Sequence, residues 1–165
     1  MTTFDPGQHK PRSAAEQRKI EAAVRELFNQ RISFNQYLGM TVDKLGTDEV
    51  SIVFDMRPEL VGHYLFGQLH GGVTSAVLDA TGGLACLWGV VEKYKHEDAD
   101  TVMHRFGRLG TVDLRVDYLL KGIGERFTAT ARVVRLGGRI AWTRMELHSE
   151  TGAQIAAAAG AYIVS

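Results

Sequence analysis

The sequence lacks several features that would assign it to a particular class of protein. A single cysteine, Cys86, excludes an internal disulfide and a cysteine-based zinc site. The 19 basic residues balance the 19 acidic ones, and a zero net charge argues against a bulk electrostatic grip on nucleic acid. The N-terminus has no apolar run typical of a secretory signal, and the longest apolar stretch, 82–91, is too short to span a bilayer. We therefore expect a cytoplasmic protein that is not inserted in a membrane.

What the chain does contain is enough apolar sequence for one buried core. It has 165 residues, of which 45% are hydrophobic, so a single domain is expected. Residues 1–12 carry two of the three prolines and no periodicity, which indicates a flexible tail. Ser13 and Glu16 form a capping box before apolar residues at helical spacing, which predicts an amphipathic helix over 13–31. We expect this helix to pack over the core or over the mouth of a binding tunnel.

The remaining patterns predict an α+β fold. Alternating residues over 40–56 flank a turn and indicate a hairpin. The stretch 71–92 is apolar on nearly every face and predicts a helix buried on most sides, with Cys86 inside the core. The polar, basic segment 93–109 is interpreted as a loop. From residue 110 onward apolar residues recur at every second position between short turns, which predicts an antiparallel meander of four strands. A five- to six-stranded antiparallel sheet would then wrap the long helix.

Candidate chemistry gathers where the buried helix begins, at His70-Gly71-Gly72. The first N–H groups of a helix have no partner inside it, and glycine lets a carbonyl approach them closely. Gly71 and Gly72 are therefore a candidate oxyanion hole, although they could equally serve only as the turn into the helix. For His70 we favour an orienting, hydrogen-bonding role over that of a base, because no nucleophile stands beside it. No spacing of histidines and acids suggests a metal site.

The other candidate is an isolated acid within the helix. Asp79 is the only charged residue between His70 and Glu92. A carboxylate in an apolar helix costs free energy unless it is paired or functional. Asp79 is therefore a candidate general base or nucleophile. The alternative is a structural carboxylate that bonds to Ser75, Thr81 or the nearby backbone.

With this glycine pair and an acid nine positions after the histidine, the chain resembles the hotdog-fold acyl-CoA thioesterases. The resemblance continues through 110–119 (GTVDLRVDYL) and 124–127 and covers residues 33–164, which implies a thioesterase domain over 32–165. It is nearest to the bacterial medium- and long-chain acyl-CoA thioesterases. It implies a hotdog fold, with a long central helix wrapped by the sheet. It also implies hydrolysis of acyl-CoA to free acid and CoA without a metal or organic cofactor.

The resemblance also implies roles for individual residues. Gly71 matches the glycine whose N–H polarises the thioester carbonyl, and Asp79 matches the catalytic carboxylate, which acts as nucleophile or as general base. Thr111 falls where relatives carry a Ser or Thr that positions the attacking water. Some relatives have Asn or Gln six residues before the motif histidine. Tyr64 stands there in this chain, so Gln68 is a candidate substitute.

Substrate and partner contacts follow from the same resemblance. Relatives form homodimers, which often pair into homotetramers, and each active site is shared across a dimer interface. The CoA phosphates would be held by the hairpin at Gly138 and Arg139 and by Arg105 and Arg108 of the basic segment. The apolar candidates for an acyl tunnel, each of which could equally be core, are Met56, Leu60, Leu65, Phe66 and Trp88.

Two other functions remain open on the sequence alone. A hotdog chain can bind an acyl thioester without hydrolysing it. A hydratase or dehydratase of the same fold would use a different pairing of acid and histidine, and the spacing of His70 and Asp79 does not favour it.

Overall fold

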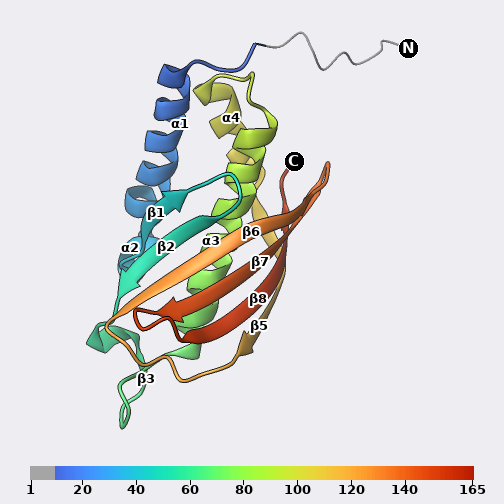
Figure 1. Cartoon of the computed structure of the whole chain (residues 1–165). Coiled ribbons are helices and arrows are strands. Elements are labelled where there is room, and N and C mark those ends of the chain that lie inside the picture. Colours follow the sequence, from blue (N-terminus) through green and yellow to red (C-terminus); the bar gives the residue numbers. More distant parts are fainter. Residues whose placement is uncertain (1–9) are drawn as a thin grey trace.

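A long helix, α3 (Gly71–Lys93), forms the centre of the computed structural model, which describes residues 10–165. An antiparallel sheet curves around one side of α3, and the N-terminal helices cover the other side (Figure 1). By length and composition α3 could also cross a bilayer, but most of it is buried within this fold. The predicted α+β architecture, with a long helix wrapped by a sheet, is confirmed.

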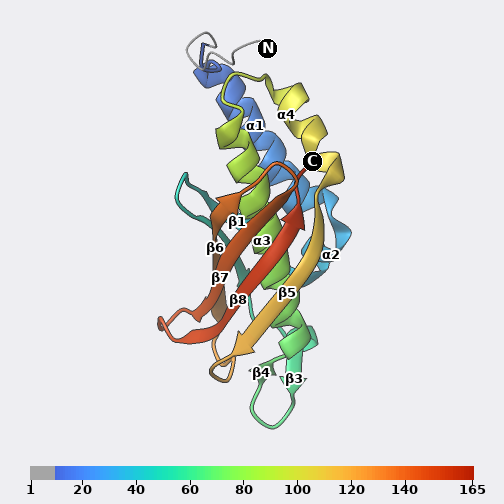
Figure 2. The same cartoon turned by 90° about the vertical axis from the view of Figure 1, so that its right-hand side faces the viewer.

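The main sheet has six strands in the order β1-β2-β6-β7-β8-β5. Their bounds are β1 (Thr41–Leu45), β2 (Val50–Asp55), β5 (Gly110–Tyr118), β6 (Arg126–Leu136), β7 (Ile140–Ser149) and β8 (Gln154–Ile163). A short turn, η2 (Pro58–Leu60), leads into a separate two-stranded hairpin of β3 (Val61–His63) and β4 (Gln68–Leu69). This hairpin lies beside the start of α3 (Figure 2).

The predicted four-strand meander is wrong in one respect. β6, β7 and β8 are consecutive neighbours, but β5 pairs with β8 at the edge of the sheet and not with β6, which follows it in sequence. Residues 119–125 therefore cross the end of the sheet before β6 begins (Figure 2). Alternation of apolar residues reports which face of a strand is buried but not which strand lies beside it, so the sequence pattern could not distinguish the two orders.

The N-terminal segment is helical, as predicted. Ser13 caps α1 (Ala14–Glu26), since its hydroxyl oxygen accepts from the N–H of Glu16 at 3.2 Å. The chain continues through a π-helical turn, η1 (Leu27–Arg31), and a short helix, α2 (Ser33–Leu38). α1 packs beside α4 (Figure 1) and buries Ile20 and Val24 in the core. The expected tail lies mostly outside the described residues, but Arg12 donates to the backbone oxygens of Tyr94, at 2.8 Å, and Val91.

The basic segment 93–109 is not simply a loop. It contains a short helix, α4 (Ala99–Arg105), and a 3-10 turn, η3 (Phe106–Arg108). Asp98 caps α4, because its carboxylate accepts from the N–H of Thr101 at 2.8 Å. Two helical turns bury only Ala99 and Val102, too few apolar residues to produce a recognisable helical period.

Candidate active site

Asp79 lies half-buried on the side of α3 that faces β5 and β8. Thr111 of β5 donates its hydroxyl proton to Asp79 Oδ1 at 2.9 Å. The hydroxyl oxygen of Tyr162, in β8, lies 3.2 Å from the same Oδ1 and 3.1 Å from the backbone oxygen of Asp79. Ser75 and Thr81 instead donate to backbone carbonyls of α3. Asp79 is thus held by the sheet and not by hydroxyls of its own helix.

Strand pairing brings the two hydroxyls to one carboxylate. Thr111 and Tyr162 are directly opposite each other in the β5–β8 register, so their side chains are on the same face of the sheet. A bulge follows Thr111, because the next paired residue of β5 is Asp113. Bulges of this kind redirect side chains and are frequent beside active sites.

A glycine of the central helix makes this approach possible. A Cβ atom built on Gly82 would overlap the hydroxyl oxygen of Tyr162 and the sulfur of Met145. Any side chain at this position would therefore displace the Tyr162 hydroxyl and the Met145 sulfur. Two side chains, and not a crossing backbone, thus occupy the space beside this glycine.

The sequence patterns did not identify Tyr162. After Ile155 the inward positions of β8 are Ala156, Ala158, Gly160 and Tyr162, one residue out of phase with an alternation counted from Ile155. β8 consists largely of alanine, so either face looks equally apolar. A large polar aromatic side chain in a strand of small residues was the one available signal.

The two glycines at the start of α3 differ in the hydrogen bonding of their N–H groups. His70 is the N-cap of α3, and its Nδ1 accepts from the N–H of Gly72 at 2.9 Å. The N–H of Gly72 is therefore already used. The N–H of Gly71 contacts no acceptor within residues 10–165, while the Gly71 carbonyl accepts from the hydroxyl of Tyr118 at 3.0 Å. Gly71 is thus the better placed of the two to bind a substrate oxygen.

Gly71 and Asp79 of one chain are far apart. Asp79 is eight positions after Gly71 in α3, and a helix rises 1.5 Å per residue, so about 12 Å of helix lies between them. An oxyanion donor and a base must both contact the reacting carbonyl group at roughly 3 Å. The two groups of a single chain therefore cannot act on the same carbonyl.

Gln68 and the predicted tunnel residues lie elsewhere. Gln68 is in β4, paired with His63 of β3. Leu65 and Phe66 are exposed at the tip of that hairpin, whereas Leu60 and Trp88 are buried in the core and Met56 packs against it. None of these five tunnel candidates lines the cavity beside Asp79. Apolar character in the sequence does not determine how far a residue lies from Asp79 in the fold.

Two cavities lie on either side of the segment that joins α4 to β5. The first, here called the small cavity, has a volume of about 150 Å³ and is lined by Asp79, Thr111, Tyr162, Asn35, Ala80, Gly83, Gly110 and the larger apolar residues Phe28, Ile32, Phe106 and Leu109. The rings of Phe28 and Phe106 are in contact, with centroids 6.1 Å apart. An apolar cavity thus opens beside the candidate base, and η1 of the N-terminal segment forms part of its wall.

The second, here called the large cavity, has a volume of about 610 Å³ and is lined by Arg105, Arg108, Gly138, Tyr94, Asp100, Thr101, His104, Val164 and Ser165. Three of the four residues predicted to hold phosphates are among these. The fourth, Arg139, is exposed in the same hairpin as Gly138 but does not line the cavity.

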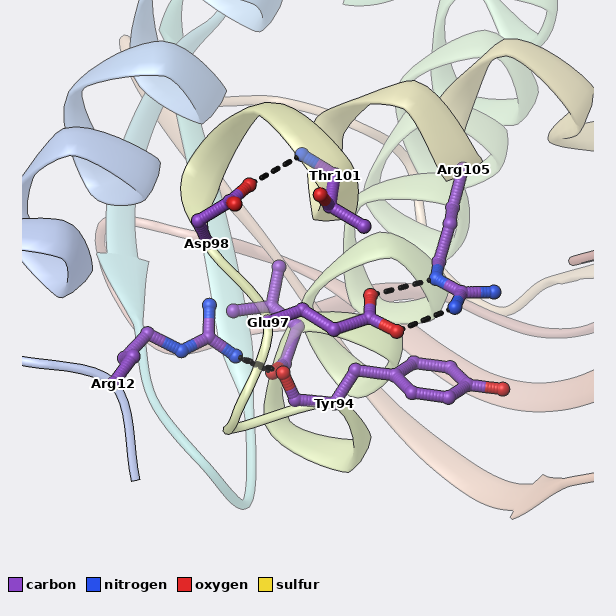
Figure 3. Close-up of polar contacts among 7 residues, drawn as sticks. Arg12, Tyr94, Glu97, Asp98, Thr101 and Arg105 are labelled. Atoms are coloured by element: carbon purple, nitrogen blue, oxygen red, sulfur yellow. Dashed lines mark hydrogen bonds and ion pairs between the residues drawn. The ribbon is translucent and has the colours of Figure 1, made fainter. Parts of the chain in front are cut away.

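The two arginines of the large cavity differ in their partners. Arg105 donates two hydrogen bonds to the Glu97 carboxylate, at 2.9 and 2.5 Å, and its guanidinium lies 4.0 Å from the centre of the Tyr94 ring (Figure 3). The Arg105 hydrogen bond lowers the pKa of Glu97 below its usual value, so the pair remains charged near neutrality. Arg108 has no ion pair with any residue of the described part of the chain. Arg108 is therefore the more available cation.

The structure does not support a cysteine nucleophile or a metal site among the described residues. Cys86 is fully buried, and burial raises the pKa of its thiol to about 12, so it does not act as a nucleophile near neutral pH. Within residues 10–165 no three histidine, cysteine or acidic side chains lie close enough to hold a metal ion.

A long helix wrapped by an antiparallel sheet is the hotdog fold, and in this chain an acid lies on that helix and a glycine pair at its start. The chain belongs to the thioesterase superfamily, whose family model matches residues 66–156. The predicted family and the predicted thioesterase class are confirmed.

Individual relatives agree with this assignment. The chain is 39% identical to the medium/long-chain acyl-CoA thioesterase YigI of Escherichia coli K12 over 141 residues, which are 86% of this chain and 91% of that protein. Identity to YigI of Salmonella typhimurium is 38% over the same lengths. A Shewanella oneidensis protein related to the thioesterase superfamily, known from a crystal structure, has 40% sequence identity to this chain. It superposes with a TM-score of 0.87, covering 93% of this chain and all of the other.

Proposed function

We propose that this protein hydrolyses medium- or long-chain acyl-CoA, with Asp79 as the catalytic carboxylate. The single observation that carries the proposal is the arrangement at Asp79: both hydroxyl donors bind Oδ1, and no donor in the described part of the chain binds Oδ2, beside an apolar cavity. The similarity to YigI supports acyl-CoA as the substrate. Purified protein is expected to release CoA thiol from acyl-CoA, measured with a thiol reagent across a series of chain lengths.

Two routes use the same residues. As a general base, Asp79 takes a proton from water while the water oxygen attacks the thioester carbon. The resulting oxyanion is bound by the N–H of a Gly71, the C–S bond breaks, and the CoA thiolate takes up the proton. As a nucleophile, Asp79 attacks the carbon itself and displaces the thiolate, and water then hydrolyses the mixed anhydride. Both routes yield the free acid and CoA, and both require an ionised Asp79.

The site is shared between two chains. Since Gly71 and Asp79 of one chain are about 12 Å apart along α3, the oxyanion donor must come from a second copy. Strand β5 suggests how. Thr111, which binds Asp79, and Tyr118, which binds the Gly71 carbonyl, occupy opposite ends of this edge strand. Antiparallel pairing of β5 with its copy, centred between Leu114 and Arg115, would place Asp79 of one chain beside Gly71 of the other.

The surface around β5 supports this dimer. The outer edge of β5 pairs with no other strand of residues 10–165, and a long unpaired edge is a ready site for strand addition. Large apolar side chains are exposed on β5 and on the segment that follows it, namely Val112, Tyr118, Leu119, Leu120 and Ile123. Covering such a patch is favourable in water.

A heterodimer of two inactive variants tests the shared site. D79N removes the base, and G71P removes the N–H of Gly71. Proline is favourable at the first position of a helix, and the φ of −66° and ψ of 135° at His70 suit a residue that precedes proline. Each homodimer lacks one half of both sites. A heterodimer purified through two different tags has one complete site, so it should recover about half of the wild-type turnover.

A heterodimer as inactive as both parents would show that the base and the amide act within one chain, and the shared site would be wrong. A matched control is G71A, which retains the N–H and whose Cβ would lie 3.4 Å from the Tyr118 ring, an ordinary contact. If G71A were as inactive as G71P, the loss would come from sterics and not from the missing donor.

The two cavities would bind the two ends of the substrate. The small cavity adjoins Asp79 and has an apolar lining, so it suits the acyl chain next to the thioester. The large cavity carries Arg108 and Arg105 and suits the CoA phosphates. Because Glu97 already pairs with Arg105, Arg108 would contribute most of this phosphate contact.

A further inference from the structure

We propose that Tyr162 is a positioning residue that holds the Asp79 carboxylate in its reactive orientation. This inference rests on the proposed function, in which Asp79 is the base or nucleophile. Tyr162 acts through Asp79 and need not touch the substrate.

The contact geometry supports a fixed carboxylate. The Tyr162 hydroxyl lies 3.2 Å from Oδ1 and 3.1 Å from the backbone oxygen of Asp79, so its one proton is shared between side chain and helix. Thr111 donates to the same Oδ1 from the neighbouring strand. Two donors on one oxygen prevent the carboxylate from rotating freely. Oδ2 is then the oxygen left to accept a proton or to attack.

The Tyr162 hydroxyl is also a permanent donor. The side chain is 1% exposed, and burial together with the nearby Asp79 charge raises the pKa of the phenol above its ordinary value. The phenol therefore keeps its proton at neutral pH and well above it. A water molecule in this position could exchange or reorient, whereas a buried phenol cannot.

Two glycines make room for this ring, and each weakens its own element. The missing side chain at Gly82 leaves space for the Tyr162 hydroxyl beside α3. A Cβ on Gly160 of β8 would lie 2.9 Å from a Tyr162 ring carbon. Glycine in the interior of a helix costs about 1 kcal/mol relative to alanine, and glycine also weakens a strand. A ring needed only to fill the core would not require its hydroxyl to reach Asp79.

The variant Y162F removes only the hydroxyl. We expect kcat to fall about 10- to 100-fold because a misoriented catalytic group loses rate, while KM for acyl-CoA changes less than about threefold. The matched control is T81V, which removes a buried hydroxyl of α3 that bonds to the backbone of Val77 and not to Asp79. T81V should keep the wild-type kcat even if its melting temperature falls.

A double-mutant cycle separates positioning from packing. If Tyr162 acts through Asp79, adding Y162F to D79N should cause no further loss of the residual activity. Full kcat in Y162F, or an equal further loss in the D79N background, would overturn the inference. Full activity of D79N alone would instead overturn the proposed function. If Y162F failed to fold, G82A, which displaces the phenol without removing it, should give the same loss of kcat, and unchanged kcat in G82A would overturn the inference.

Discussion

The small and the large cavity differ in size and in the charges they carry, although neighbouring residues of the segment from Arg105 to Thr111 line both of them. The small cavity is mostly apolar, contains one carboxylate held by two hydroxyls, and is built from α3, the sheet and the N-terminal segment. The large cavity has two arginines in its wall, is about four times larger, and is lined mainly by α4 and by residues near the end of β8.

This contrast assigns the breaking of the thioester bond to the small cavity and the binding of CoA to the large one. A base acts best when it is fixed and partly shielded from water, whereas a phosphate is held by exposed cations with weaker geometric demands. Substitutions in the small cavity should therefore change kcat or the choice of acyl chain. Substitutions in the large cavity should change only the affinity for the CoA portion.

The largest effect is expected at the base. D79N should lower kcat about 1,000-fold, because removal of a general acid or base typically costs a factor of 10² to 10⁴. Initial rates of CoA thiol release measure this change. The control D55N alters an exposed acid at the end of β2 and should retain full activity. A normal rate in D79N would show that the small cavity is not the site of bond breaking.

A smaller effect is expected at the wall of the small cavity. F106A removes a half-buried ring that contacts Phe28, which lengthens the cavity. The ratio of kcat/KM for a long-chain over a medium-chain acyl-CoA should rise about tenfold, since each buried methylene contributes roughly 1 kcal/mol. F34A is the control, because Phe34 is exposed and lines neither cavity. An unchanged chain-length profile in F106A would place the acyl chain elsewhere.

The smallest effect is expected in the large cavity. R108A should raise KM for acyl-CoA about fivefold with kcat unchanged, as is typical of one exposed ionic contact. With an S-acyl pantetheine, which lacks the nucleotide phosphates, R108A and the wild type should have the same KM. R132A, an exposed arginine outside the cavity, serves as control. A loss of kcat in R108A would contradict the separation of binding from chemistry.

Elements with a clear period or a local signal were predictable from the sequence. The structure contains the predicted long helix, the predicted hairpin of β1 and β2, and the predicted buried faces of β6 and β7. Each of these elements buries a continuous apolar stripe, which a sequence pattern displays. Asp79 stood out because an acid within an apolar helix requires an explanation. The helix start was marked by the adjacent glycines.

What the sequence did not reveal depends on the partner of each element. The pairing of β5 with β8 is decided by the path of the chain around α3, and no residue of β5 specifies it locally. The role of Tyr162 follows from that pairing, from the bulge beside Thr111 and from the absence of a side chain at Gly82. Such information is distributed over three elements, and no single segment displays it.

Gly82 and Gly83 of α3 differ in whether they can be replaced by alanine. Replacing glycine by alanine within a helix is a common way to raise thermal stability, by roughly 0.5 to 1 kcal/mol. At Gly83 a Cβ would meet only Leu109, at 3.6 Å, so the substitution fits. At Gly82 the same substitution would separate the helix from Tyr162 and Met145. A thermostabilised version of this enzyme should therefore accept alanine at one position and keep glycine at its neighbour.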